Sequence, residues 1–166
     1  MRSTDILADS LSRIAENVHG VLDGIDADGL VWRPENHGNS VAWLIWHLTR
    51  VQDSHIADLA GTEQVWIVDG WVDRFGLDLP AGHTGYAHSS DDVAKVDVRD
   101  RELLRGYHDA THAATLRYLE GLSDADLDEV IDENWDPPVR RGVRLVSLVD
   151  DDAQHVGQAA FVAGLR

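Results

Sequence analysis

Asp151 and His155, near the C-terminal end of the sequence, have residue types and a spacing that suit metal chemistry. In an α-helix, side chains four positions apart project from the same face, so a carboxylate oxygen and an imidazole nitrogen of this pair can reach one ion. The predicted face is apolar at both ends and polar in the middle, and consists of Leu148, Asp151, His155, Gln158, Ala159 and Val162. A carboxylate buried on such a face costs several kcal/mol unless a hydrogen bond, an ion pair or a metal compensates it.

The spacing alone leaves three interpretations open. The pair binds a metal ion, or Asp151 orients a neutral His155 in the core, or both side chains face water beside Asp150 and Asp152. A metal needs further ligands from another segment, because sites in helical bundles collect side chains from facing helices. The chain has nine histidines and no cysteine, so these ligands have to be nitrogen or oxygen atoms.

Several histidines compete for the place of the third ligand. His47 and His55 lie in the segment predicted as the second helix, His47 on the flank of the apolar stripe and His55 within it. His108 and His112 are four positions apart in the predicted third helix and form a second candidate pair. The residues by themselves do not decide between these possibilities.

Apolar residues at steps of three and four predict four long helices that hold these side chains in place. The predicted helices cover about residues 4–22, 40–59, 91–122 and 144–165, and the third has a break near residues 96–98. Residues 61–90 have many glycines and no lasting period, so they form a long crossover that we expect to cover something. We therefore predict an all-α fold: a four-helix bundle with a long irregular crossover between helices two and three, a single domain over residues 1–166, and no strand pairing.

Composition excludes several classes of function. The 166 residues include 30 Asp plus Glu against 14 Lys plus Arg, a formal net charge of -16 that repels the phosphate backbone of nucleic acids. No run approaches the roughly 20 apolar residues of a membrane span, and residues 1–10 lack the apolar stretch of a signal peptide. We expect a cytoplasmic protein that binds neither nucleic acid nor membrane.

Two motifs resemble those of a known family. Residues 151–158, DDAQHVGQ, look like the closing-helix motif of the DinB-like superfamily of metalloenzymes, in which a ligand, three residues, a histidine, any residue, Gly, and Gln or His recur. Residues 43–48, WLIWHL, look like the second-helix motif of the same family, whose histidine is the first metal ligand. The resemblance implies that His47, Asp151 and His155 are the protein ligands and that water or substrate fills the remaining positions.

The acidic residue at position 151 resembles one particular branch of this family. Many members carry histidine in place of Asp151, whereas the mycothiol-dependent maleylpyruvate isomerase branch, which the chain resembles here, uses a Glu. Two imidazoles and one carboxylate suit Zn²⁺, the metal we expect, and also accept Ni²⁺, Mn²⁺ or Fe²⁺. Such an ion lowers the pKa of a bound water or thiol. Because the chain has no thiol of its own, the resemblance implies a low-molecular-weight thiol such as mycothiol or bacillithiol, which would react with an electrophile in S-transfer or isomerisation.

Two other classes stay open: a non-catalytic metal-binding module in which the ion ties helices two and four together, and a plain dimerisation domain. Around the site we expect Gln158 to support His155, and Trp43, Tyr86 and Arg50 to line the pocket.

We also expect a homodimer. Six tryptophans, including Trp66 and Trp71 in the crossover, are a large aromatic load for one small core, and aromatic residues often anchor interfaces.

Overall fold

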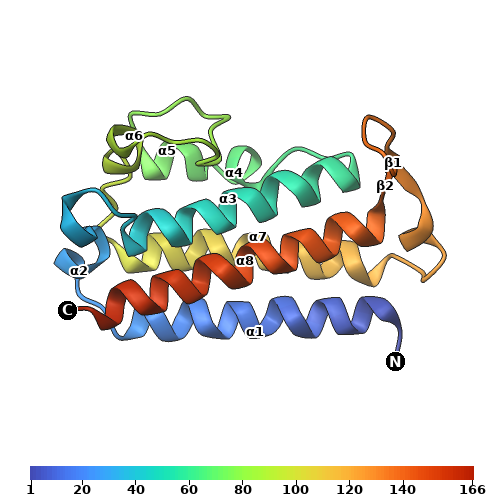
Figure 1. The fold of residues 1–166 in the computed structure, drawn as a ribbon, viewed down its shortest axis with the longest axis horizontal. Coiled ribbons are helices and arrows are strands. Elements are labelled where there is room, and N and C mark those ends of the chain that lie inside the picture. The colour runs from blue at the N-terminus through green and yellow to red at the C-terminus, as the bar shows by residue number, and fades with distance from the viewer.

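Four long helices pack side by side in the computed structural model, which describes residues 1–166 (Figure 1). They are α1 (Ser3–Asp23), α3 (Val41–Ala60), α7 (Arg101–Glu120) and α8 (Arg141–Gly164). Both α1 and α3 pack against α7 and α8, so the helices surround a common core in the cyclic order α1, α7, α3, α8. This arrangement confirms the predicted all-α four-helix bundle.

Local signals place the ends of α3 where the sequence predicted them. The Ser40 hydroxyl accepts a hydrogen bond from the Trp43 amide at the start of the helix. Gly61, with φ of 66°, follows the last turn in the left-handed conformation that glycine adopts without strain. This helix contributes His47 to the candidate site, so its register matters for function.

The third long helix begins later than predicted. The residues expected to begin it form a separate short helix, α6 (Ser90–Ala94), and the break near residues 96–98 is a full interruption. Val96 and Val98 are buried there in non-helical chain, and α7 begins only after Asp100, whose carboxylate accepts from two amides of the first turn. Burial of these valines outside a helix explains why the apolar periodicity misled the prediction.

The crossover contains short helices instead of being irregular throughout. These are α4 (Val65–Val68) and α5 (Trp71–Phe75), and Figure 1 shows them with α6 on the side of α3 that faces away from α1. Trp66 and Trp71 are both buried, with ring centroids 5.0 and 5.8 Å from that of Tyr107. Both tryptophans fit into the core of this chain, so they give no support to a homodimer, which stays a prediction.

Short elements join the remaining helices. Between α1 and α3 lie α2 (Ala27–Val31) and a 3₁₀ turn, η1 (Pro34–Asn36), and between α7 and α8 lies a second turn, η2 (Asp126–Asp128). The strands β1 (Val130–Asp132) and β2 (Val139–Arg140) follow and pair antiparallel. The sequence analysis predicted no strand pairing and missed this hairpin, because each strand is too short to show a period of two.

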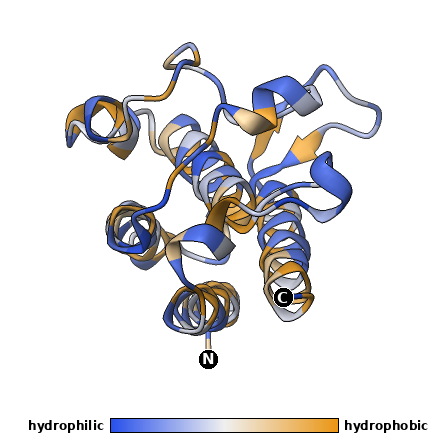
Figure 2. Cartoon of the chain, turned by 90° about the vertical axis from the view of Figure 1, so that its left-hand side faces the viewer, coloured by the Kyte–Doolittle hydropathy of each residue, from blue (hydrophilic) through white to orange (hydrophobic).

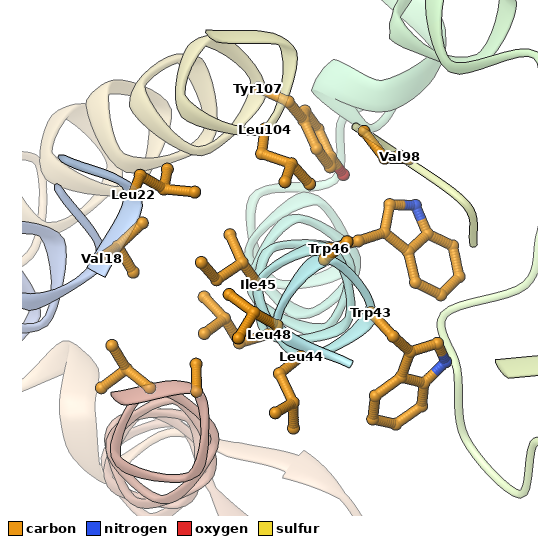
Figure 3. Close-up of a cluster of buried hydrophobic side chains, with 14 of the residues drawn as sticks. Val18, Leu22, Trp43, Leu44, Ile45, Trp46, Leu48, Val98, Leu104 and Tyr107 are labelled. Carbon is orange, nitrogen blue, oxygen red and sulfur yellow. The ribbon is translucent and has the colours of Figure 1, made fainter. Parts of the chain in front are cut away.

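The core surrounds α3. Leu44, Ile45 and Leu48 point toward the other long helices, whereas Trp43 and Trp46 point to the opposite side, beneath the crossover (Figure 3). Every residue from 40 to 50 is consequently buried, as expected of a helix covered on all sides. The other long helices carry apolar residues on some faces and polar residues on others, as Figure 2 shows in a view along the bundle. None of the helices combines the length and apolarity needed to cross a membrane.

The buried face of α8 differs from the predicted one by a small rotation. It consists of Leu145, Leu148, Asp152, Val156, Ala159 and Val162. Asp152, which the sequence analysis considered only as a water-facing neighbour, is 0 % exposed. Asp151 and His155 lie on the flank of this face and Gln158 is exposed, so the predicted polar stripe does not point into the centre of the bundle.

Candidate metal centre

His47, Asp151 and His155 come together where α3 meets α8. One ligand atom from each of the three side chains lies within 4.8 Å of those of the other two. The imidazoles of His47 and His155 face each other nearly edge to face, with ring centroids 4.5 Å apart and an angle of 77° between the planes. The spacing of four between Asp151 and His155 brings both onto the side of α8 that faces α3, as the helical periodicity requires.

Both imidazoles are held by hydrogen bonds to backbone carbonyls. His47 donates from Nδ1 to the carbonyl of Thr84 in the crossover, at 2.5 Å. His155 donates from Nδ1 to the carbonyl of Asp151 in the preceding turn of α8, at 2.8 Å. Donation from Nδ1 leaves Nε2 as the unprotonated nitrogen of each neutral ring, which is the form that accepts a metal ion.

The carboxylate of Asp151 has an unused acceptor. Its Oδ2 atom is buried and accepts no hydrogen bond, although His155 Nδ1 lies 3.3 Å away. A buried carboxylate oxygen without a donor is costly, and a cation at this position would compensate the cost. The three residues therefore fit a divalent metal ion in geometry and in donor chemistry.

The pKa values of the two imidazoles in the cluster shift in opposite directions. Burial lowers the pKa of His47 more than the carbonyl of Thr84 raises it. For His155, burial acts in the same direction, but the adjacent Asp151 outweighs it and raises the pKa. Burial would raise the pKa of Asp151, yet the neighbouring imidazoles, His155 foremost, hold it below its ordinary value. A metal ion at this centre would thus compete with the proton on His155.

Trp43 forms one wall of the centre. Its ring stacks on His47, with centroids 4.6 Å apart and 16° between the planes, and meets His155 edge-on at 6.5 Å. The indole Nε1 donates to Nδ1 of His88 in the crossover, at 3.2 Å. Trp43 therefore restricts the orientation of both imidazoles from the side of the crossover.

Two of the predicted pocket residues lie elsewhere. Tyr86 is 88 % exposed, so its side chain points into solvent and lines no pocket at the centre. Gln158 is also exposed and makes no hydrogen bond to His155, whose Nδ1 is already bound to the carbonyl of Asp151. The backbone of α8 supplies the contact that the sequence analysis assigned to a glutamine side chain.

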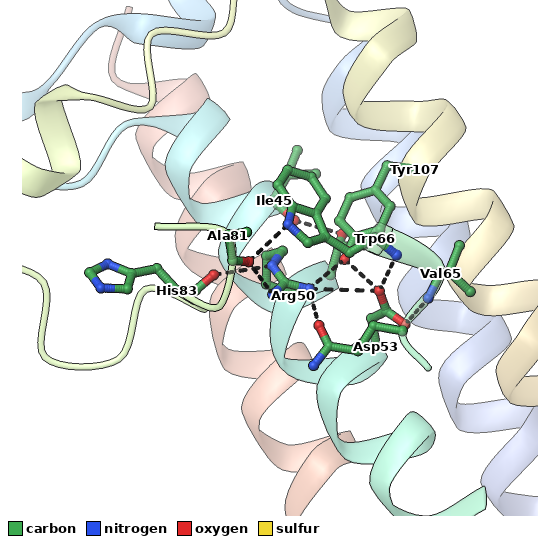
Figure 4. A network of polar contacts seen from close by, with 10 residues as sticks. Ile45, Arg50, Asp53, Val65, Trp66, Ala81, His83 and Tyr107 are labelled. Carbon is green, nitrogen blue, oxygen red and sulfur yellow. Dashed lines mark hydrogen bonds and ion pairs between the residues drawn. The ribbon is translucent and has the colours of Figure 1, made fainter. Parts of the chain in front are cut away.

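Arg50 supports the centre from beneath the crossover without lining it. This side chain is completely buried and donates to the carbonyls of His83, at 3.1 Å, and Ala81, at 3.3 Å (Figure 4). It also donates to Gln64 Oε1 at 2.8 Å. These bonds fix the segment directly before Thr84, the residue whose carbonyl orients His47. Arg50 is therefore a positioning residue.

A buried aspartate completes this network. The carboxylate of Asp53 accepts hydrogen bonds from the amides of Val65 and Trp66 and from the hydroxyl of Tyr107, all at 2.8 to 2.9 Å. Arg50 Nη1 lies 3.7 Å from Asp53 Oδ2, so the two buried charges are paired. Asp53 and Tyr107 were not among the predicted site residues. The available signal was the charged pair Arg50 and Asp53, spaced i, i+3 inside an apolar helix.

Gly85 and Thr84 were missed as well, and no local pattern marks them. Gly85 has φ of 98°, and an added Cβ would overlap Nδ1 of His47.

The competing histidines lie outside the centre. His55 lies two helical turns after His47 on α3, and its Nδ1 is 3.4 Å from Arg144. His108 and His112 lie on α7, which faces the other side of the bundle core.

Comparisons with known proteins agree with this architecture. A family model described as the DinB superfamily matches residues 10–159. The crystal structure of a conserved protein from Enterococcus faecalis matches with a TM-score of 0.93 and 36% sequence identity, covering 98% of this chain and 96% of that chain. No curated protein matches the sequence. The description of the Enterococcus protein states no activity.

Proposed function

Since the chain belongs to the DinB superfamily, we propose that His47, Asp151 and His155 bind one divalent metal ion, with Zn²⁺ as the favoured ion. One observation carries this proposal: three potential ligands from two helices converge, and the carboxylate among them has a buried oxygen without a hydrogen-bond donor. Three protein ligands leave at least one position of a tetrahedral ion for water or substrate.

We further propose that a low-molecular-weight thiol such as mycothiol occupies the open position, as in a thiol S-transferase or a thiol-dependent isomerase. The resemblance of the two motifs supports this proposal. Because the chain has no cysteine, any thiol nucleophile has to come from solution. A thiol loses its proton when it binds such an ion. The side chains of Asp151 and His155 are partly exposed, 36 % and 18 % respectively, so the centre lies close to the protein surface.

A cleft lies further along the same seam, and none of the three proposed ligands lines it. It measures about 570 Å³ and lies where α3 and α8 meet the crossover, next to His55, Asp58, Gln64, Gly82 and Arg144. His55 is eight residues after His47 on α3, which corresponds to about 12 Å along the helix axis. Arg144 in this cleft already lies 3.6 Å from Asp132 Oδ2, so an anionic substrate group would compete with that carboxylate for the guanidinium.

The experiment is metal analysis of protein purified without added metal, followed by metal titration of the chelator-treated protein. Compared with the wild type, His47→Ala, Asp151→Ala and His155→Ala should each bind one equivalent less. Asp150→Ala and His37→Ala are matched controls, because both residues are exposed and Asp150 is adjacent to Asp151 in sequence. Both variants should bind as much metal as the wild type does. Undiminished binding by His47→Ala would show that the proposed ligand set is wrong.

A structural metal site is the second candidate. The ligands come from α3 and α8, so an ion would clamp these helices together whether or not it reacts. Titration of a thiol into the Co²⁺-substituted protein separates the two functions. A thiol-binding centre should give a new thiolate-to-metal absorption band. An unchanged spectrum would support the purely structural metal site. We keep the homodimer as a separate proposal, because its presence would be compatible with either function.

A further inference from the structure

A second cluster of metal-ligating side chains lies between α1 and α7. His19 of α1 and His108 and Asp109 of α7 each place one potential ligand atom within 4.8 Å of the other two. His19 Nε2 lies 2.6 Å from Oδ1 of Asp109, and His108 Nδ1 lies 4.0 Å from the same oxygen. The donor set, two imidazoles and one carboxylate, is the same as that of the centre between α3 and α8.

His108 is the unusual member of this cluster. Its side chain is only 1 % exposed, and neither ring nitrogen has a hydrogen-bond partner. An imidazole always carries at least one N–H donor and normally one acceptor, and burying both without partners is costly. Most buried polar groups are satisfied, so a fully unsatisfied histidine calls for a partner such as a bound ion.

Neighbouring side chains do not supply that partner. The distance of 4.0 Å from His108 to Asp109 is too long for a hydrogen bond, and the Asp109 oxygen is already bound to His19. The ring of His112 lies parallel to that of His108, with centroids 6.1 Å apart, and its Nε2 lies 3.4 Å from the Ser12 hydroxyl. The hydrogen bond between His19 and Asp109 therefore accounts for two of the three residues and leaves His108 without a partner.

We propose that His19, His108 and Asp109 form a second divalent metal site that is independent of the first. In a tetrahedral Zn²⁺ site, neighbouring ligand atoms lie about 3.3 Å apart, given metal–ligand distances near 2.0 Å. The separation of 2.6 Å would lengthen and that of 4.0 Å would shorten, each by about 0.7 Å, which side-chain rotation can provide. Zn²⁺ and Ni²⁺ are the ions that this nitrogen and oxygen set favours.

The position of the site indicates its role. His19 and Asp109 are partly exposed, so water can complete the coordination and the ion can enter from solvent. Because α1 and α7 meet across the core from the seam of α3 and α8, the two sites lie on opposite sides of the bundle. An ion bound to His19, His108 and Asp109 would tie the first helix to the third long helix without contact to the first centre.

The stoichiometry of Zn²⁺ binding tests the proposal. Chelator-treated wild-type protein should bind two equivalents in equilibrium dialysis, and His19→Ala and Asp109→Asn should each bind one. Both substitutions alter partly exposed side chains, so they spare the core that His108→Ala would disturb. His37→Ala, at an exposed histidine in neither cluster, is the control and should bind two.

The outcomes separate this site from the first. A wild-type protein that binds one equivalent, lost in His47→Ala and kept in His19→Ala, would overturn the second site and leave the first intact. One equivalent lost in His19→Ala and kept in His47→Ala would support the second site and contradict the first. Long-range ¹H–¹⁵N spectra of His47→Ala give a second readout: the ring nitrogen resonances of His108 should shift on addition of Zn²⁺, and unchanged resonances would overturn the proposal.

Discussion

Replacing Gly85 with alanine should damage the candidate metal centre through the crossover, without altering any ligand. Gly85 has φ of 98°, a conformation that residues with a Cβ rarely adopt. A Cβ at this position would overlap Nδ1 of His47 and lie 3.1 Å from Cγ of the same ring and 3.1 Å from Cζ2 of Trp43. The substitution therefore presses on the atom of His47 that donates to the carbonyl of Thr84.

The cost has two parts. Strain of a non-glycine residue in a sparsely populated backbone region amounts to about 1–3 kcal/mol. Loss of the hydrogen bond from His47 to Thr84 adds about 0.5–1.5 kcal/mol, so the free energy of unfolding should fall by roughly 2–4 kcal/mol. For metal binding, removal of the group that orients a ligand typically lowers affinity about 10–100-fold.

Two assays measure these effects separately. Urea unfolding in the presence of chelator reports the stability of the metal-free protein, and competition with a chromophoric chelator reports Zn²⁺ affinity at the first centre, measured in the His19→Ala background. Gly82→Ala is the matched control, because it lies in the same crossover, a Cβ there meets no atom within 4 Å, and its φ is not positive. Equal stability and equal affinity in the two alanine variants would refute the reasoning. Lower stability with unchanged affinity would refute the link between Gly85 and metal binding.

Four further predictions follow from the same contacts. Chelation should lower the melting temperature of the wild type more than that of His155→Ala, since an ion present at about 100 times its Kd stabilises the folded state by about 2.7 kcal/mol; equal shifts in scanning calorimetry would contradict this. Asp152→Asn should stabilise the chelator-treated protein by roughly 1–3 kcal/mol at pH 7, because burial raises the pKa of Asp152 and its carboxylate has no hydrogen-bond donor. The folded protein then binds this proton more tightly than the unfolded chain does, so wild-type stability falls as pH rises above 4 and the advantage of the variant should shrink as pH falls towards 4; a gain that does not depend on pH in urea unfolding would contradict this. In amide exchange of the metal-free protein, Val65 and Trp66 should exchange slowly because both amides donate to the buried Asp53, whereas fast exchange at both would indicate that the crossover opens as a whole. Light scattering should give twice the chain mass of 18.4 kDa, and association should not weaken as salt screens the net charge of -16; a mass near 18.4 kDa would refute the homodimer.

The long helices were predictable from the sequence because their packing repeats at the helical period. Ser40 and Gly61 mark the ends of α3 by capping and by a left-handed residue, and both signals are local. Val96 and Val98 misled the prediction because a buried extended segment has the same composition as a buried helix. The hairpin of β1 and β2 escaped notice because its strands have three and two residues.

The candidate ligands were also predictable from helical spacing, whereas the groups that orient them were not. Asp151 and His155 share one side of a helix by spacing alone, and the motif around His47 identified the partner helix. Thr84 contributes only its carbonyl, which any residue has, so its identity carries no signal for this role. Asp152 shows the limit of periodicity: a small rotation of the buried face, which keeps Leu148 and Ala159, moved a charged side chain from the predicted surface to the core.

Arg50 connects the packing of the crossover with the orientation of His47. A buried guanidinium is stabilising only if nearly all of its donors have partners, and here carbonyls at residues 81 and 83 supply two of them. The crossover thus supplies hydrogen-bond acceptors for the buried guanidinium of Arg50 on α3. The same crossover carries the Thr84 carbonyl that orients His47, which lies one turn before Arg50 on that helix. Loss of the guanidinium would leave the His83 carbonyl without this donor and the Ala81 carbonyl with only its hydrogen bond from Trp66 Nε1, and it would loosen the Thr84 segment. The structure therefore links the stability of the crossover to the orientation of a metal ligand through one helix, and a change in either should be measurable in the other.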